Sequence, residues 1–178
     1  MYQLSLNTSD IAELAQHLEH AASKDIRWIE WRGERNDDVL DVIENFCREN
    51  GIILTVVDDV NLLEDKRFHG ILVTKNPDNI PEWREKLGGH PIIGVEISVD
   101  SDWRKLRGYD VDYIVLNLDR HSQEETIKLA GIIKDEWNVP IVARGTNISP
   151  ESGSILLESN FNGICFLNTN SLINFLGK

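Results

Sequence analysis

Acidic side chains interrupt several apolar runs of the sequence, and they are the residues best placed to do chemistry. Glu30 stands within IRWIEW, Glu96 within PIIGVEIS, and Asp58 directly after IILTVV. A carboxylate among apolar residues needs a partner, or it takes up a proton. Such groups can act as general acids or bases, or can bind a divalent cation. We therefore predict Glu96 and Asp58 as candidate catalytic residues, with Asp58 also a candidate metal ligand.

Two arginines could supply the opposite charge. Arg32 follows Glu30 by two positions, so both side chains are expected on the same side of a strand. Arg144 ends the apolar run PIVAR. We predict a polar network in which Glu30 pairs with Arg32 and which Glu96 or Arg144 extends. A structural role and a ligand-binding role are both compatible with this network.

The stretch PIVARGTNISPES, residues 140–152, begins like a phosphate-binding turn. Its glycine lies between an apolar run and a helix start, where backbone N–H groups could meet an anion. A second candidate phosphate site follows the last apolar run, at Asn168 and Thr169. Ordinary capping of the next helix is the alternative explanation for these residues. Asn117 also ends an apolar run, so we expect it at the same C-terminal end of the predicted strands. The predicted phosphate- or substrate-binding residues are Glu30, Arg32, Asn117, Arg144, Gly145, Thr146, Asn168 and Thr169.

Short apolar runs alternate with longer amphipathic runs eight times along the chain. The apolar runs begin near Tyr2, Ile26, Ile52, Gly70, Pro91, Asp112, Pro140 and Gly163. Their spacing of about 18 to 28 residues is that of βα units with tight loops. An open doubly wound sheet needs only five or six such units, so we predict one domain over 1–178, a compact (β/α)8 TIM barrel of α/β class. The chemistry of such barrels lies at the C-terminal ends of the strands.

The helices expected after the third, fourth and fifth strands are short. They correspond to VNLLEDKR, IPEWREKLG and SDWRKLRG, with about two turns each. These short helices explain how eight units fit into 178 residues. Polar residues that simply meet solvent where strands end, such as Asp59, Lys75 and Asp119, need no functional explanation.

The composition excludes some classes of partner. A formal charge of −12 leaves no basic excess for nucleic acid. We find no run of 18 or more apolar residues, so we expect no membrane span, and MYQLSLNTSD lacks a signal-peptide pattern. We expect a cytoplasmic protein in which Cys47 and Cys165 are buried free thiols. The sequence leaves open whether the chain forms a homo-oligomer.

The order of these motifs resembles thiamine-phosphate synthase and its TenI relatives over nearly the whole chain. The family patterns QLREK, NDR, DGVHLGQEDLP, IIGVS, ADYI, PVVAIGGITPEN and ADGVAVVSAI are matched in order by residues 30–34, 57–59, 69–81, 92–96, 111–114, 140–152 and 161–170. The resemblance implies a transferase or isomerase of thiamine-related phosphate metabolism that uses Mg²⁺. It also implies that Arg32 contacts pyrophosphate and that Asp58 binds the metal.

The residues that carry the family's chemistry match less well. Glu34 replaces a lysine that contacts pyrophosphate, and Asn79 replaces a metal-binding acid, with Asp78 one position away. Glu96 begins the segment that replaces a serine-threonine-histidine run, and a long loop with a lysine is missing after Asn117. A departing pyrophosphate needs cations and Mg²⁺ to stabilise it. The sequence therefore predicts a divergent member without efficient synthase activity.

Three functions remain open at this point. The first is altered chemistry on a small phosphorylated or anionic metabolite, held by local groups at the C-terminal rim. The alternative is a non-catalytic binding or interaction module on a degenerate barrel. A third is another phosphate-binding barrel such as phosphoribosylanthranilate isomerase, whose catalytic cysteine and aspartate are not evident here.

Overall fold

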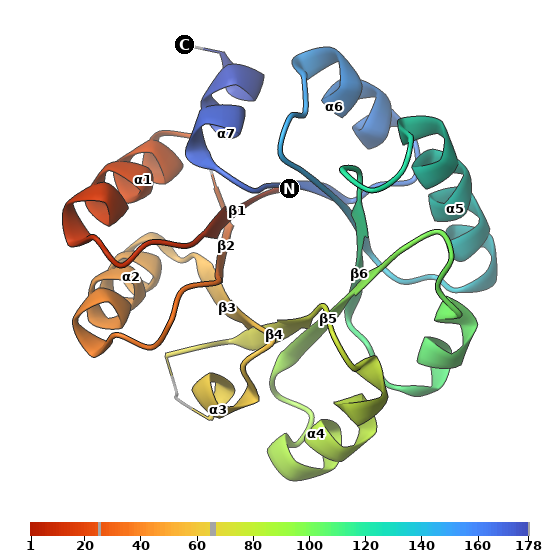
Figure 1. Cartoon of the computed structure of the whole chain (residues 1–178), viewed down its shortest axis with the longest axis horizontal. Helices are drawn as coiled ribbons and strands as arrows, with labels where there is room; N and C mark the ends of the chain where they lie inside the picture. Colours follow the sequence, from red (N-terminus) through yellow and green to blue (C-terminus); the bar gives the residue numbers. More distant parts are fainter. Residues whose placement is uncertain (25, 65–66, 178) are drawn as a thin grey trace.

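Eight parallel strands close into a barrel in the order of the sequence (Figure 1). The computed structural model describes residues 1–24, 26–64 and 67–177 of the 178. The strands are β1 (Tyr2–Leu6), β2 (Trp28–Trp31), β3 (Ile53–Val57), β4 (Gly70–Val73), β5 (Ile92–Ile97), β6 (Tyr113–Asn117), β7 (Ile141–Gly145) and β8 (Gly163–Phe166). β1 pairs with both β2 and β8, which closes the ring. The predicted eight-stranded TIM barrel is confirmed.

Helices surround the barrel on its outside (Figure 1). They are α1 (Ile11–Ser23), α2 (Asp37–Asn50), α3 (Val60–Leu63), η1 (Pro77–Asn79), α4 (Ile80–Leu87), η2 (Trp103–Gly108), α5 (Gln123–Glu136), α6 (Pro150–Glu158) and α7 (Thr169–Leu176). The short helices predicted after β3, β4 and β5 are present: α4 has eight residues and η2 is a 3-10 helix of six residues, whereas α3 has a single turn, shorter than predicted. Residues 65–66 of the segment predicted after β3 lie outside the described residues. α1 and α7, from opposite ends of the chain, pack side by side.

The helix boundaries follow local chemistry. Ser122 and Glu125 form a complete capping box at the start of α5. Gly51 ends α2 with φ +62°, a left-handed conformation that glycine adopts without cost. Asn168 caps α7 by accepting a hydrogen bond from the backbone of Ser171. These local signals fix where α2 ends and where α5 and α7 begin.

Strand residues alternate between two packing environments. One set points outward and packs under the helices; it includes Leu4, Ile29, Leu54, Ile71, Ile93, Ile114, Ile141 and Ile164. The other set points into the barrel and comprises Trp28, Leu72, Tyr113, Val115, Val142 and Cys165. The outward layer is continuous and apolar, so its burial supplies most of the hydrophobic stabilisation. The inward layer is mixed, because polar residues share it.

Gly94 on β5 makes room for the largest inward group of its neighbour. A Cβ at this position would overlap the ring of Tyr113, which lies opposite it in the register. The same ring makes an edge contact with Trp28 at a centroid distance of 5.1 Å. The indole Nε1 of Trp28 donates to the hydroxyl of Thr55 at 3.0 Å. These aromatic residues fill the barrel interior.

Arg84 of α4 binds the start of two strands, on the face opposite the strand C-termini. Its guanidinium donates to the carbonyl oxygens of Pro91 and Asp110, at 2.6 Å and 2.7 Å. It also pairs with the carboxylate of Asp112, which accepts from the backbone N–H of Ile93 at 2.7 Å. Only 11% of the Arg84 side chain is exposed. This cluster, the Arg84 clasp, joins β5, β6 and α4 at one point.

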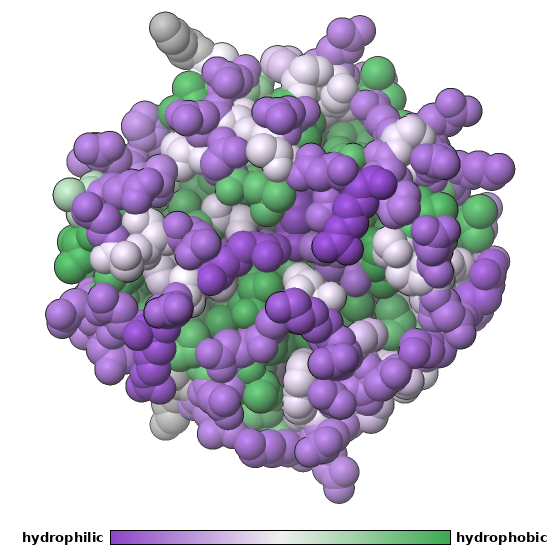
Figure 2. Space-filling model, in the orientation of Figure 1, coloured by the Kyte–Doolittle hydropathy of each residue, from purple (hydrophilic) through white to green (hydrophobic). Residues whose placement is uncertain are grey.

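The surface carries hydrophilic side chains around most of the periphery, with smaller apolar areas between them (Figure 2). Among the helices of the described residues, none combines the length and apolar character needed to cross a membrane. Ile11, Ile132 and Ile155 are exposed on three different helices. Such scattered apolar side chains are normal on a protein surface.

Candidate functional site

A buried ion-pair network crosses the inside of the barrel. Arg144 on β7 donates through one terminal nitrogen to Glu30 on β2 and through the other to Glu96 on β5. The side chains of Arg144 and Glu30 are 1% and 0% exposed, and that of Glu96 is 7% exposed. We call these three residues the interior triad. It contains two carboxylates and one guanidinium, so its acidic groups outnumber its cations by one.

Burial and charge act against each other in this network. Burial lowers the pKa of the Arg144 guanidinium, but neighbouring acids, Glu30 first, raise it more, so the net pKa is above its usual value. Burial also raises the pKa of Cys165 to about 12, and the charge of Glu30 adds to this shift. Tyr113 behaves similarly, with a pKa well above its ordinary value, mainly through burial. Arg144 is therefore permanently charged, while the thiol and the phenol stay neutral.

Some buried polar atoms beside the triad have no hydrogen-bond partner among the described residues. They include Oε1 of Glu30, Nε of Arg144, the hydroxyl of Tyr113 and both amide atoms of Gln3. Cys165 directs its sulfur to Glu30 at 3.6 Å. An unsatisfied buried polar group costs free energy. These unpaired polar atoms in the barrel interior therefore lower the stability of the fold.

The structure corrects the predicted pairing of Glu30 with Arg32. The prediction used strand periodicity alone, which places both on one side of β2 but says nothing of the strands across the barrel. Arg144 reaches Glu30 from the opposite wall, and Arg32 donates instead to the hydroxyl of Ser5 on β1 at 2.8 Å. Arg32 thus lies above the triad, between the ends of β1 and β2.

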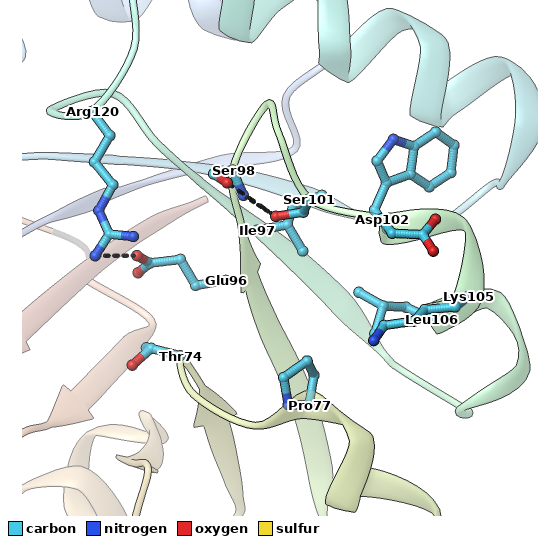
Figure 3. A pocket seen from close by; sticks show the side chains of 11 residues that line it. Thr74, Pro77, Glu96, Ile97, Ser98, Ser101, Asp102, Lys105, Leu106 and Arg120 are labelled. Atoms are coloured by element: carbon cyan, nitrogen blue, oxygen red, sulfur yellow. Dashed lines mark hydrogen bonds and ion pairs between the residues drawn. The ribbon is translucent and has the colours of Figure 1, made fainter.

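A small cavity opens on the C-terminal side of the barrel, next to Glu96 (Figure 3). We call it the rim pocket; it is about 270 Å³ in volume, and its lining includes Glu96, Ile97, Ser101, Lys105, Leu106 and Arg120. Ser98 and Ser101 bond to each other at 3.0 Å on one side, and Thr74 and Pro77 lie across from them. Apolar and polar groups therefore meet in one cavity of small-molecule size.

Glu96 joins the rim pocket to the interior triad. Its Oε2 pairs with Arg144, while its Oε1 accepts from the amide of Asn117 at 3.3 Å. Arg120, from the loop after β6, approaches the same Oε1 at 3.9 Å and is 65% exposed. Figure 3 shows Arg120 and Glu96 facing each other beside the pocket. One carboxylate oxygen is thus held firmly and the other only loosely.

Asp58 lies apart from the triad, in the turn after β3. It has φ +57°, and its carboxylate accepts from the backbone N–H groups of Thr74 and Lys75, at 2.6 Å and 3.2 Å. Its second oxygen accepts from the hydroxyl of Thr74. Both oxygens are thus bound to the loop after β4. Asp58 therefore ties two rim loops together.

The residues present do not fit the Mg²⁺ that the family resemblance implied. Asp78 is engaged by Lys105 at 2.9 Å and by the hydroxyl of Tyr109 at 3.0 Å. The Lys105 bond is the main reason that the pKa of Asp78 lies below its ordinary value. Within residues 1–24, 26–64 and 67–177, no three His, Cys, Asp or Glu side chains gather as a metal site would require.

The turn after β7 is already bound to a carboxylate. Thr146 donates its backbone N–H to both oxygens of Asp119, at 3.1 Å, and its hydroxyl to one of them at 2.7 Å. Gly145 is buried as the last residue of β7. The Asp119 side chain, from the loop after β6, therefore takes the donors that a phosphate would use. Asp119 is exposed, as predicted, but it also makes these contacts with Thr146, which the sequence did not indicate.

Asn168 and Thr169 also use their polar groups within the protein. Asn168 accepts from the N–H of Ser171 at 2.8 Å, which is ordinary capping. The hydroxyl of Thr169 bonds to Nδ1 of His17 on α1 at 2.7 Å. The structure therefore brings Glu30, Glu96, Asn117 and Arg144 together and leaves Arg32, Asp58, Asn168 and Thr169 in separate contacts.

Sequence reasoning missed Arg120, Ser101 and Lys105 as pocket residues. Arg120 follows Asn117 by three positions and could have been read as a rim residue. Ser101 and Lys105 line the pocket from the segment that follows β5, before and within η2, and a 3-10 helix leaves no clear periodic signal.

Comparisons with known proteins agree with this architecture. A family model described as thiamine monophosphate synthase matches residues 2–169. A thiamine-phosphate synthase of Bacillus mycoides is 26% identical over 148 residues, which cover 79% of this chain and 67% of the relative.

Two solved structures from Pyrococcus furiosus share the fold. Thiamine phosphate pyrophosphorylase superposes with a TM-score of 0.74 at 15% identity, covering 93% of this chain and 84% of that chain. A mutant tryptophan synthase alpha-subunit gives 0.79 at 12% identity, covering 99% and 98%. At these identities the structures support the barrel alone, whereas the family model covers nearly the whole sequence. The chain belongs to the thiamine monophosphate synthase (TMP-TENI) family.

Proposed function

We propose that this chain is a small-molecule-binding member of its family that does not make thiamine phosphate efficiently. The observation that carries the proposal is the interior triad. Arg144 is a cation at the centre of the barrel, but Glu30 and Glu96 already hold both of its terminal nitrogens. A diphosphate would have to compete with two carboxylates for it. Replacing such buried partners is costly.

The turn after β7 supports the same conclusion. Asp119 accepts both donors of Thr146, so a phosphate at this turn would have to displace a carboxylate. The resemblance implied a lysine where Glu34 stands, and the acid adds repulsion instead. A leaving diphosphate is stabilised by cations and by Mg²⁺, and Asp58 is tied to the loop after β4.

The rim pocket supports a binding function. It combines a nearly buried carboxylate, hydroxyl groups and apolar walls in one small cavity, which is typical of ligand sites. Arg144 binds one oxygen of Glu96, and a bound cation disfavours the uptake of a proton by a general base. Asp58 would have to release Thr74 before it could act as a base. The alternative of a non-catalytic binding module is thus the better supported of the two hypotheses. The buried free thiols of Cys47 and Cys165 fit a reducing, cytoplasmic location.

A pyrophosphate-release assay tests the loss of synthase activity. The full chain is given the pyrimidine pyrophosphate, the thiazole phosphate and Mg²⁺, with the Bacillus mycoides relative as the active control. We expect no release above the rate without protein. Turnover comparable to that of the control contradicts the proposal, provided that Asp58→Ala abolishes it. That variant distinguishes this chain from a contaminating enzyme.

A further inference from the structure

The charges around the rim pocket favour one class of ligand. Asp102 is a second acid in the lining, and Lys105, one of two cations there, is already paired with Asp78 at 2.9 Å. The remaining cation, Arg120, lies 3.9 Å from Glu96 and is 65% exposed. A pair of this kind contributes little to stability. Oε1 of Glu96 therefore has only a weakly held cationic partner at the pocket.

We propose that the rim pocket binds a small organic cation, whose ammonium or amidinium group takes the place of Arg120 at Oε1 of Glu96. This inference rests on the binding function proposed above and names its ligand class. A cation at this point would pair directly with Oε1 of Glu96, while Arg144 keeps Oε2. Since Glu96 is 7% exposed, its interaction with a partner is stronger than at an open surface.

The apolar part of the pocket sets the shape of the ligand. Ile97 and Leu106 line the pocket beside the carboxylate, and Pro77 faces them from the loop after β4 (Figure 3). A ring-sized apolar body fits a cavity of about 270 Å³. The hydroxyl groups of Ser98 and Ser101 already bond to each other, so they complement a ligand with few polar groups of its own.

An anionic ligand is less well matched. It would meet Glu96 and Asp102 in the pocket and would have to draw Lys105 from Asp78. The whole chain carries a formal charge of −12, which attracts cations over a distance and repels anions. The net charge of the chain and the acidic groups of the pocket therefore both favour a cationic ligand over an anionic one.

Three probes that share one ring separate the charge classes: benzylammonium, benzyl alcohol and benzoate. The full chain, labelled at its Ile and Leu methyl groups, is titrated with each probe and with inorganic phosphate. We expect saturable shifts at Ile97 and Leu106 with benzylammonium, and weaker or no shifts with the other three. Binding of benzoate or phosphate with equal or higher affinity would overturn the inference of a cation.

Two variants test the role of each charge. Arg120→Ala removes the competing cation, and we expect it to tighten benzylammonium binding by about two- to five-fold. Glu96→Gln is expected to weaken it by roughly ten-fold or more, because a charged hydrogen bond is lost. Glu158→Gln, an exposed acid on α6, is the matched control and should change nothing. Because Arg120 is exposed, its variant keeps the test valid even if Glu96→Gln does not fold.

The outcomes separate this inference from the function on which it rests. If benzoate binds in the rim pocket and Arg120→Ala weakens it, the pocket is a ligand site for anions and only the ligand class is wrong. If none of the four probes shifts Ile97 or Leu106, the rim-pocket binding function fails as well. The pyrophosphate-release assay judges the loss of synthase activity independently of both.

Discussion

The barrel interior and the rim loops both use carboxylates to bind hydrogen-bond donors, but at very different depths. Inside the barrel, Glu30 and Glu96 hold Arg144, and Arg144 and Glu30 are almost fully buried. At the rim, Asp119 holds the donors of Thr146 in an exposed contact. Water can replace the partner of an exposed group, whereas a buried charge left alone has no substitute. The interior contact is therefore a fixed part of the fold, and the rim contact can be exchanged.

The largest effect is expected from Arg144→Met, which leaves two buried carboxylates without their cation. We expect a loss of about 3–5 kcal/mol in the free energy of unfolding, measured with chemical denaturant. Part of the loss should be recovered as the pH falls, because protonation removes the uncompensated charges. Arg104→Met removes an exposed pair with Glu136 and is the control, with less than about 1 kcal/mol. Equal losses in the two variants would abolish the distinction between interior and surface.

Asp58→Ala tests a rim contact of intermediate strength. The variant loses the bonds to Thr74 and Lys75 and places a side chain other than Asn or Asp at φ +57°. We expect a loss of about 1.5–3 kcal/mol. Asp58→Asn tolerates the left-handed conformation and keeps an oxygen acceptor, so it should lose less. A midpoint of the wild type that rises with added Mg²⁺ would show that Asp58 serves a metal after all.

Gly94→Ala tests whether space, apart from charge, limits the interior. The added methyl group would overlap Tyr113, and we expect a loss of about 1–3 kcal/mol from overpacking. Gly131→Ala on α5 is the matched control, since the nearest atom to its Cβ is 3.4 Å away. In a helix interior this change should stabilise by about 0.5–1 kcal/mol. Shifts of the denaturation midpoint in opposite directions, down for Gly94→Ala and up for Gly131→Ala, would confirm that the barrel interior is tightly filled.

Asp119→Ala should have the smallest effect. Its contact with Thr146 is exposed, so we expect a loss below about 1 kcal/mol in denaturant unfolding. Asp119→Asn, which keeps an oxygen at the same place, should lose still less. A loss as large as that of Arg144→Met would show that the rim loop is as firmly fixed as the interior.

The sequence predicted the fold well because its signal repeats. Outward residues such as Ile29, Ile114 and Ile164 occur in apolar runs at regular intervals, and each run forms a strand. Helix ends were equally readable, since the chemistry of Gly51, Ser149 and Asn168 is local. The short helix η2 was also predicted, but its 3-10 type was not, because a 3-10 helix has no distinctive residue pattern.

The site was harder to predict because its contacts join distant parts of the chain. The choice of Glu30, Glu96 and Arg144 came from charges within or at the ends of apolar runs, and the structure places them together. Their pairing could not be read, since 114 residues separate Glu30 from Arg144. Asp119 was read as a solvated residue because nothing in its neighbourhood reveals a contact with Thr146, 27 positions later. The roles predicted for these residues in binding or catalysis remain predictions.

The Arg84 clasp has a consequence for how this molecule could change over time. It anchors α4, β5 and β6 through two main-chain oxygens and the carboxylate of Asp112, so it depends on few side chains. Because these contacts lie where β5 and β6 begin, substitutions in the loops after the C-terminal ends of the strands do not disturb them. A chain built this way can acquire a new ligand while it keeps the same scaffold.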